Sequence, residues 1–400
     1  MALYEGIALI QEKQAVVLDL GTDYTKFGFT GEAAPRCIIR SEYWCPSTRK
    51  YKRVYDYTTP EELYDNLVHM LHLLYFRHVL VNPKERKVVI VESLLTPTLF
   101  RETLAKVLFI HYEVSGVMWV DSGRASALTL GAPVVLVVSL GARDAEITAV
   151  VHGCPVIQAI QSQPLGARAI HDELARILDE DNGTELHLSE DVLEDIKVRA
   201  CFVPSREKAV EWLERGVASE VREVRGAGGA REGGGARVPV SRRARALAAE
   251  PLFARDNELA SLPDIVLQCI LQCPIDARRA LAENVLVVGG GAALPGLKAR
   301  LAHELRHLVT LPPYRERLGQ LQFKFHSAPA HDNSVAWLGG ALCGAACGAG
   351  GGAGAAGGGA WAGEAARGLA RDAYARAPRL RDWPSLLHNT PPHHPHWALQ

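Results

Sequence analysis

The chain has 400 residues, above the size at which one hydrophobic core usually divides, so we expect two lobes. Hydrophobic residues make up 48% of it and charged residues 22%, which excludes wholesale disorder. The 44 lysines and arginines balance 45 aspartates and glutamates; the net charge of -1 argues against a protein that tracks phosphates, so we expect no nucleic-acid partner.

Signals for export and membrane insertion are weak. The first 14 residues lack a basic segment and a long apolar stretch, so we expect no signal peptide. Residues 338–360 are uncharged, but 11 of these 23 positions are glycine, so we expect no membrane insertion. Eight cysteines without a dense framework are typical of a reducing compartment, which favours the cytoplasm.

Two apolar runs, each followed by a glycine turn and a second apolar segment, lie about 120 residues apart. Residues 15–21 (AVVLDLG) precede residues 26–29 (KFGF), and residues 134–141 (VVLVVSLG) precede the alternating residues 145–150 (AEITAV). These patterns predict strand, turn and strand in both places. We interpret them as an internal repeat.

Helices are predicted between the strands. One begins at Pro60 and runs to about Arg77, with Thr59 as its N-cap and two glutamates in its first turn. Similar patterns cover residues 100–107 and 170–178. The alternation of strands and helices indicates an α/β protein with covered sheets.

A third apolar run, residues 285–288 (VLVV), leads into three glycines and a helix predicted over residues 297–308. A strand, glycine turn and helix in succession are typical of anion sites, because the N–H groups at a helix N-terminus point at the turn. Three glycine turns are the arrangement needed to hold a nucleotide.

Three segments have biased composition. Residues 215–245 contain eight arginines, seven glycines and three glutamates, so we predict a flexible Arg/Gly loop, with a functional basic patch as the alternative. Residues 344–359 are Ala/Gly-rich and predict a linker or frayed helix. Residues 380–386 (LRDWPSL) are a candidate docking tail.

Five motifs in order resemble the actin family. Residues 19–36 (DLGTDYTKFGFTGEAAPR) resemble its first phosphate loop, residues 195–203 (DIKVRACFV) its nucleotide-contacting helix, and residues 288–296 (VGGGAALPG) its adenosine loop. Residues 273–278 (CPIDAR) and 337–340 (WLGG) also match in order and spacing. The resemblance covers roughly residues 13–345, apart from the Arg/Gly segment.

The resemblance implies an actin-like two-lobed fold of duplicated RNase-H-like subdomains around a nucleotide cleft. The implied divisions are an outer lobe of residues 1–129 plus 335–400, with a reduced pointed-end subdomain at 37–60, and an inner lobe of residues 130–334, with a flexible insert at 204–250. The pointed-end subdomain is expected to be short because only 23 residues separate Arg36 from Pro60.

The same motifs imply which residues contact a nucleotide, ATP or ADP, with or without Mg²⁺. The expected contact residues are Asp19, Gly21, Thr22, Lys26, Gly141, Lys197, Gly289 and Gly290. We assign no dedicated metal ligand and no catalytic residue.

Three departures from the family pattern argue against an enzyme. Ser139 replaces an aspartate that helps organise the magnesium shell, and Ser122 replaces the glutamine that positions the attacking water. Asp23 replaces a glycine and places a carboxylate beside the phosphates; like charges there repel by roughly 4 kcal/mol at an effective dielectric near 20, unless a cation bridges them.

Residues 74–83 (LYFRHVLVNP), 269–276 (CILQCPID), 335–340 (VAWLGG) and Asp382–Trp383 resemble a divergent branch of the family at the pointed end of dynactin's short filament. The resemblance implies a non-catalytic structural subunit of the cytoplasm and cytoskeleton. It would cap a filament of actin-related protein 1 and β-actin and help recruit dynactin subunits 4, 5 and 6 for dynein-driven microtubule transport. A subunit that lacks the pointed-end loop ends a filament, because growth requires a repeated heterologous contact.

Other interpretations stay open. The chain could be an actin-fold ATPase, or a nuclear actin-related subunit of a chromatin remodeller, and the short segment could be trimmed without functional meaning. The i, i+4 pairs Cys269/Cys273 and Cys343/Cys347 could hold zinc, but we favour buried free thiols because no histidine lies at ligand spacing.

Overall fold

The computed structural model describes residues 14–217, 220–225, 237–255, 260–349 and 368–380. The chain forms two compact units, residues 1–125 with 336–400 and residues 126–335. The unit boundaries fall within α4 (Ser122–Leu130) and at the start of α13 (Val335–Ala349). Each unit is built on one central sheet.

The first unit has a six-stranded sheet in the order β16–β7–β6–β1–β2–β3. β1 pairs antiparallel with β2 and parallel with β6, and β6 pairs parallel with β7. The strands are β1 (Val16–Leu20), β2 (Tyr24–Phe29), β3 (Cys37–Arg40), β6 (Lys87–Glu92), β7 (Gly116–Asp121) and β16 (Leu369–Ala370). The helices are α2 (Pro60–Leu73), α3 (Thr98–Lys106), α13, α14 (Arg371–Arg376) and two π-helical turns, η1 (Leu74–Val79) and η2 (Val107–His111).

Helices cover both faces of this sheet because successive strand residues point to opposite sides. Leu18 lies in one buried cluster with leucines of α2 and α3, whereas Val17 faces α13. The Trp337 indole donates a hydrogen bond to the Val17 carbonyl (3.1 Å). A Cβ at Gly340 would lie 2.3 Å from Val91 Cγ2, so α13 packs directly on the strands.

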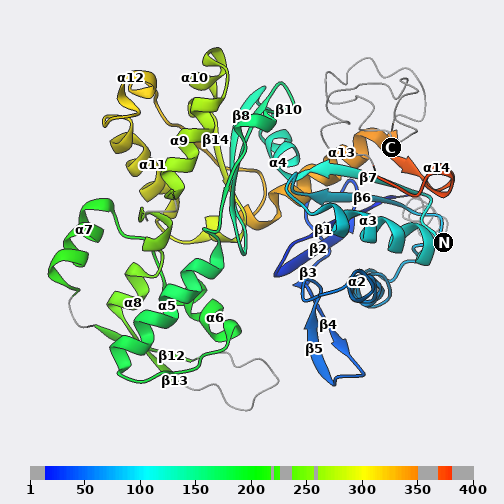
Figure 1. The fold of residues 1–400 in the computed structure, drawn as a ribbon, viewed down its shortest axis with the longest axis horizontal. Helices are drawn as coiled ribbons and strands as arrows, with labels where there is room; N and C mark the ends of the chain where they lie inside the picture. The colour runs from blue at the N-terminus through cyan, green and yellow to red at the C-terminus, as the bar shows by residue number, and fades with distance from the viewer. Residues whose placement is uncertain (1–13, 218–219, 226–236, 256–259, 350–367, 381–400) are drawn as a thin grey trace, which may run out of the picture. The chain divides into compact units, whose positions relative to one another are not determined.

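A separate two-stranded hairpin, β4 (Glu42–Cys45) and β5 (Lys50–Arg53), lies beside α2 (Figure 1). Thr59 accepts a hydrogen bond from the Glu62 N–H (3.2 Å) at the start of α2, which confirms the predicted N-cap. The α-helix ends at Leu73 and continues as η1, so the predicted end near Arg77 lies inside a π-helical turn.

The second unit has a sheet in the order β10–β9–β8–β14–β15, with β11 paired to β9. Its strands are β8 (Val134–Leu140), β9 (Ala145–Val151), β10 (Cys154–Pro155), β11 (Gln161–Gln163), β14 (Val285–Val288) and β15 (Phe325–His326). Its longer helices are α5 (Ala167–Asn182), α6 (Glu190–Ala200), α7 (Arg206–Arg215), α9 (Leu262–Gln272), α10 (Ile275–Glu283) and α11 (Leu297–Leu308). Shorter helical turns are α8 (Arg242–Leu247), α12 (Arg315–Leu318), η3 (Ile157–Ala159), η4 (Glu250–Leu252), η5 (Gly290–Ala293) and η6 (Asp332–Ser334).

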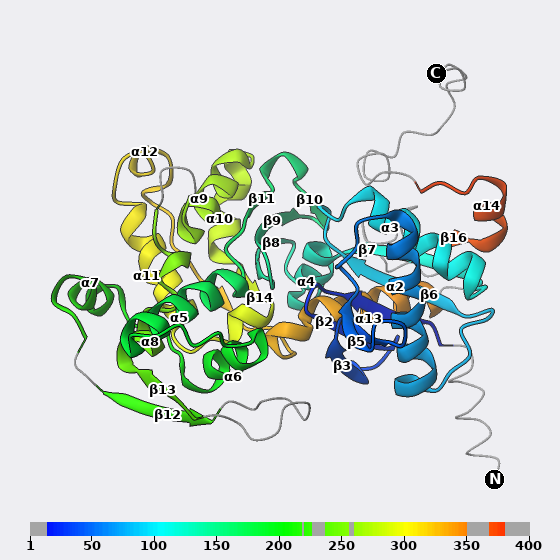
Figure 2. The ribbon, with the colours of Figure 1, turned by 60° about the horizontal axis from the view of Figure 1, so that its bottom comes forward.

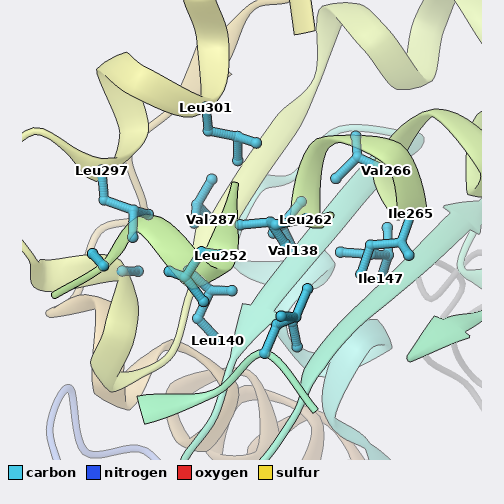
Figure 3. Packing of buried hydrophobic residues seen from close by; sticks show 14 of the residues in the cluster. Val138, Leu140, Ile147, Leu252, Leu262, Ile265, Val266, Val287, Leu297 and Leu301 are labelled. Carbon is cyan, nitrogen blue, oxygen red and sulfur yellow. The ribbon is translucent and has the colours of Figure 1, made fainter. Parts of the chain in front are cut away.

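The core of this unit lies between the sheet and helices α9 and α11 (Figure 3). Val138 and Ile147, from neighbouring strands, lie close to Leu262 and Ile265 of α9. On the opposite face, alternate residues of β8 and β14 pack with the end of α4. The sheet is therefore covered on both sides, as the apolar runs predicted.

The predicted internal repeat is present. In each unit an antiparallel three-strand meander (β1–β2–β3 or β8–β9–β10) is joined by a later strand (β6 or β14) that runs parallel to the first strand. The helix predicted over residues 297–308 has those bounds. The helices predicted at 100–107 and 170–178 correspond to α3 and α5.

We expected a flexible insert at residues 204–250. This expectation is wrong for much of the segment. The described residues there form α7, α8 and a second hairpin, β12 (Val221–Arg225) paired with β13 (Arg237–Ser241) (Figure 2). Val238 and Val240 alternate into the core, and Arg245 pairs with Glu220 (3.1 Å). Paired charges and a few alternating valines thus build structure that an arginine-rich composition obscured. Residues 226–236, the glycine-rich centre, lie outside the described residues.

Several expectations fall partly outside the described residues. α13 ends at Ala349, and the remainder of the Ala/Gly-rich segment and of the candidate docking tail (381–386) is not described. In the described part of the chain, no helix is long and apolar enough to span a bilayer. Cys269 and Cys273 are buried as expected, whereas Cys347 is exposed. No group of three or more His, Cys, Asp or Glu side chains that could hold a metal ion occurs among these residues.

Candidate nucleotide site

The turn between β1 and β2 holds the first group of expected nucleotide contacts. Asp19 and Lys26 face each other across the antiparallel pair, and Lys26 Nζ lies 3.0 Å from Asp19 Oδ2. Each side chain is 15% exposed, so this ion pair remains accessible at one edge. Gly21 and Thr22 lie in the turn between them. The structure therefore brings these four residues together.

Gly21 is held by contacts that require glycine. A Cβ at this position would lie 2.7 Å from the Tyr24 carbonyl oxygen, closer than such atoms approach. The Ser41 hydroxyl donates to the Gly21 carbonyl (2.6 Å), and Thr25 Oγ1 lies 2.8 Å from Ser41 Oγ. Ser41 was missed in the sequence, which has no local signal for a contact 20 residues away.

A hollow adjoins this turn within the first unit. Its lining residues are Thr22, Asp23, Arg40, Ser41, Glu42 and Arg53. Two guanidinium groups therefore line the same hollow as Asp23. The Glu42 carboxylate lines it too, so the two positive and the two negative side chains of the hollow balance one another.

The second hairpin turn contains Gly141 and lies against the start of α5. The Gly141 N–H donates to Asp144 O, and the Gly141 carbonyl accepts from the Ala167 N–H (both 3.0 Å). The Arg168 N–H donates to the Ala142 carbonyl (2.9 Å). The first N–H groups of α5 thus hold the turn in place, and the anion-binding surface of this hairpin is limited to the turn itself.

The third glycine turn contacts the second. Gly289 has φ +95°, and a Cβ there would lie 2.3 Å from the Leu140 carbonyl oxygen. Its N–H donates to Asp332 O (2.8 Å). Gly289 therefore lies against the residue that precedes Gly141, and these two site residues are neighbours in the second unit. At Gly290, by contrast, an added Cβ would meet no atom within 4 Å.

The predicted strand–turn–helix geometry is modified by a 3₁₀ turn. η5 follows β14, and α11 begins only at Leu297. Gly296, the N-cap of α11, packs against Val203 O, which a Cβ would approach to 2.2 Å. The close approach of the chain at Gly296 explains why the loop carries another glycine there.

Lys197 lies on α6. Leu193 and Ile196 are the buried residues of this helix, and Lys197 is half-buried beside them. Arg199 pairs with Asp195 one turn away (2.8 Å).

The two serines that depart from the family pattern lie at strand ends. Ser122 begins α4, and the preceding Asp121 is buried and accepts hydrogen bonds from the N–H groups of Gly123 (3.3 Å) and Arg124 (2.7 Å). Ser139 lies near the end of β8, opposite Glu146 on β9. The Asp121 carboxylate therefore caps the first turn of α4.

These elements define a protein with the actin fold: two units of related topology, each with a glycine turn between paired strands. The family model for actin matches residues 62–347, and the chain belongs to the actin family. It is 24% identical over 394 residues to actin-related protein 10 of Dictyostelium discoideum, which covers 83% of each chain. It is also 24% identical over 366 residues to actin-related protein 2 of Arabidopsis thaliana, which covers 83% of this chain and 92% of that protein. The first likeness agrees with the motifs that favoured actin-related protein 10, also called 11.

Members of the actin family usually bind a nucleotide, and residues of this chain fit one. The β1–β2 turn offers the accessible Lys26. In the second unit, an added Cβ at Gly290 would meet open space, whereas one at the neighbouring Gly289 would clash with Leu140 O. Lysines and backbone N–H groups of glycine turns are typical phosphate ligands.

Proposed function

We propose that this protein is a structural subunit that caps the pointed end of dynactin's actin-like filament. The observation that carries the proposal is the short segment between Arg36 and Pro60, whose 23 residues hold only β3, β4 and β5. Growth at this end requires a loop that reaches the next subunit. A subunit without it joins a filament through one face and offers no matching contact on the other.

The proposed role uses a bound nucleotide as a structural ligand. ATP or ADP, with or without Mg²⁺, would be held by Asp19, Gly21, Thr22 and Lys26 of the first unit, and by the second group: Gly141, Lys197, Gly289 and Gly290. Ligand that binds only the folded state stabilises it. Because Ser122 and Ser139 cannot orient water or organise a metal shell as glutamine and aspartate do, we propose no turnover.

The partners follow from the same proposal. The capped filament is that of actin-related protein 1 and β-actin, and the exposed end recruits dynactin subunits 4, 5 and 6 for dynein-driven transport. The location is the cytoplasm and its cytoskeleton. The similarity to actin-related protein 10 of Dictyostelium supports this choice over a nuclear remodeller subunit.

A direct test adds the purified chain to filaments of actin-related protein 1 and follows both ends by fluorescence microscopy. We expect elongation to stop at one end only, with one copy of the chain per filament. A chain that leaves both ends growing, or that co-purifies with a remodelling complex instead of dynactin, contradicts the proposal. A variant with a longer loop in place of residues 46–49 tests whether the short hairpin itself is responsible.

A further inference from the structure

An ion pair in the second unit joins the start of α11 to η6. Lys298 Nζ lies 2.9 Å from Asp332 Oδ1 and 2.8 Å from Oδ2, so the ammonium group holds both carboxylate oxygens. The two side chains are 34% and 22% exposed. The main-chain carbonyl of Asp332 also accepts the Gly289 N–H (2.8 Å). Asp332 therefore connects α11 to the third glycine turn.

The bond from Gly289 ties this turn to a part of the chain that is distant in sequence. Within the turn, the Ala292 N–H donates to the Gly289 carbonyl (3.2 Å), which closes the turn on itself. The bond to Asp332 instead fixes the turn to η6, at the point where the left-handed Gly289 (φ +95°) leads into Gly290. The direction in which Gly290 presents its backbone thus depends on where η6 holds Gly289.

The helix that carries Lys298 is a firmer support than η6. η6 is a single turn of three residues, whereas α11 has twelve. Leu297, Leu301 and Leu305 of α11 are fully buried in the core of the second unit (Figure 3). Lys298 therefore links a short turn to a helix that the core holds in place.

The position of this lysine is unfavourable for the helix itself. Lys298 lies in the first turn of α11, where the helix dipole favours acidic side chains over cations. An ion pair with this exposure also adds little to global stability, because water screens it. Its ammonium group nevertheless reaches the residue that holds the glycine turn. Local order at the turn explains the pair better than stability of the whole unit does.

We propose that Lys298 and Asp332 are positioning residues that pre-organise the Gly289–Gly290 turn for the nucleotide. They act through the backbone of Gly289. A turn that is already held in one conformation loses less conformational freedom when its ligand binds, so the ligand binds more tightly. The inference rests on the nucleotide binding proposed above and names the residues that prepare one of its turns.

Hydrogen exchange of the ligand-free chain measures the order of the turn. Lys298→Met keeps the apolar stem of the side chain but removes its charge, and the Gly289 amide should then exchange about fivefold faster than in the wild type. Lys298→Arg keeps the charge and should exchange like the wild type. The charge-swapped double variant, Lys298→Asp with Asp332→Lys, should recover most of the protection because it restores the pair in reverse.

Titration calorimetry with ADP measures binding by the same proteins. Lys298→Met should raise the Kd about fivefold while the melting temperature of the ligand-free chain changes little. The charge-swapped variant should bind ADP nearly as the wild type does, which a loss of packing alone would not produce. Arg279→Met removes an exposed ion pair with Glu283 on α10 and is the matched control; it should change neither the exchange of Gly289 nor the Kd.

The outcomes separate this inference from the proposed function. Unchanged exchange of Gly289 in Lys298→Met, faster exchange with an unchanged Kd, or a charge-swapped variant as weak as the single one would each overturn the inference. If the wild-type chain binds no ADP, the nucleotide proposal fails and takes the role in binding with it, while the exchange rates still decide whether the pair holds the turn. If Lys298→Met does not fold, Asp332→Asn removes the same pair from its other side.

Discussion

Gly289 and Gly290 are neighbours in the sequence but differ in what their missing side chains allow. Gly289 combines a left-handed backbone with a carbonyl oxygen 2.3 Å from its absent Cβ, whereas Gly290 faces open space. The first glycine is therefore required by the fold. The second is free to serve a ligand.

This contrast gives a matched pair of variants. We expect Gly289→Ala to lower the free energy of unfolding by about 2–4 kcal/mol, because it adds backbone strain and a steric clash. Gly290→Val should leave the melting temperature of the ligand-free chain almost unchanged but reduce the rise produced by ATP or ADP, because its side chain occupies the open space. Thermal melts with and without nucleotide measure both. An equal nucleotide response in wild type and Gly290→Val would show that no base or ribose lies there.

Cys45, half-buried at the end of β4, is expected to be more reactive than the exposed Cys347. A hydrogen bond from Ser47, whose Oγ lies 3.1 Å from Cys45 Sγ, together with bonds from Thr48, lowers the pKa of Cys45 to about 6. Partial burial raises the pKa of Cys347 on α13. Since the thiolate is the nucleophile, iodoacetamide at pH 7 should label Cys45 well before Cys347, and labelling of Cys45 should slow as the pH falls below about 6.

Peptide mapping of the labelled chain measures these rates. Ser47→Ala removes the first hydrogen bond and should move the pH dependence of Cys45 labelling toward higher pH. Identical profiles for the variant and the wild type would remove Ser47 as the cause.

At the scale of elements, α2 and the β4–β5 hairpin are joined through Glu62. Its carboxylate accepts hydrogen bonds from Lys52 on β5 and from the N–H and hydroxyl of Thr58, and these bonds lower the pKa of Glu62 to about 2. The ordinary value is 4.5. A depressed pKa in the folded state contributes stability that is present above about pH 4.5 and is lost as the pH falls toward 2.

Replacement of Glu62 tests whether its carboxylate causes this pH dependence of stability. Glu62→Gln should lower the melting temperature at pH 7, and the difference from wild type should shrink steadily between pH 4.5 and pH 2. Glu61→Gln removes a carboxylate from the same helical turn without removing the contact to β5, so it serves as the control. A difference that is constant with pH would mean that the Glu62 carboxylate is not held as described.

Local patterns predicted most elements correctly, and the errors have a common cause. The strands around Gly21 and Gly141 and the helix that begins at Leu297 follow from apolar periodicity, which acts over a few residues. The contact of Ser41 with Gly21 depends on residues far apart in the chain. The β12–β13 hairpin likewise depends on alternate valines and on the pairing of Glu220 with Arg245, which composition does not reveal. The sequence predicted where the glycines of the candidate site lie. It did not predict which of these glycines has open space in the place of a side chain.

At the scale of the whole molecule, we propose that the chain binds a nucleotide without turnover. Both units retain a glycine turn after their first strand, but serines stand at positions 122 and 139, where the family pattern leads us to expect glutamine and aspartate. We expect phosphate release from ATP to stay at background for the wild type. Ser122→Gln with Ser139→Asp should raise it, since these changes restore a water-orienting amide and a metal-organising carboxylate. Ser139→Asn serves as the control, because asparagine is similar in size to aspartate but is uncharged. Wild-type release at the rate of filament-forming actins would contradict the proposal.

We propose that the face around Leu128, a half-buried residue of α4, receives the filament, whereas the short hairpin segment offers no contact to a further subunit. Leu128→Asp should weaken filament binding roughly tenfold or more, because burial of an unpaired carboxylate costs several kcal/mol. Leu213→Asp on α7, where the leucine is 61% exposed, is the matched control and should bind normally.

The purified wild-type chain should not polymerise alone at any salt concentration that polymerises actin. Homopolymers in electron micrographs, or subunits added beyond this one at the pointed end, would show that the short hairpin does not terminate growth.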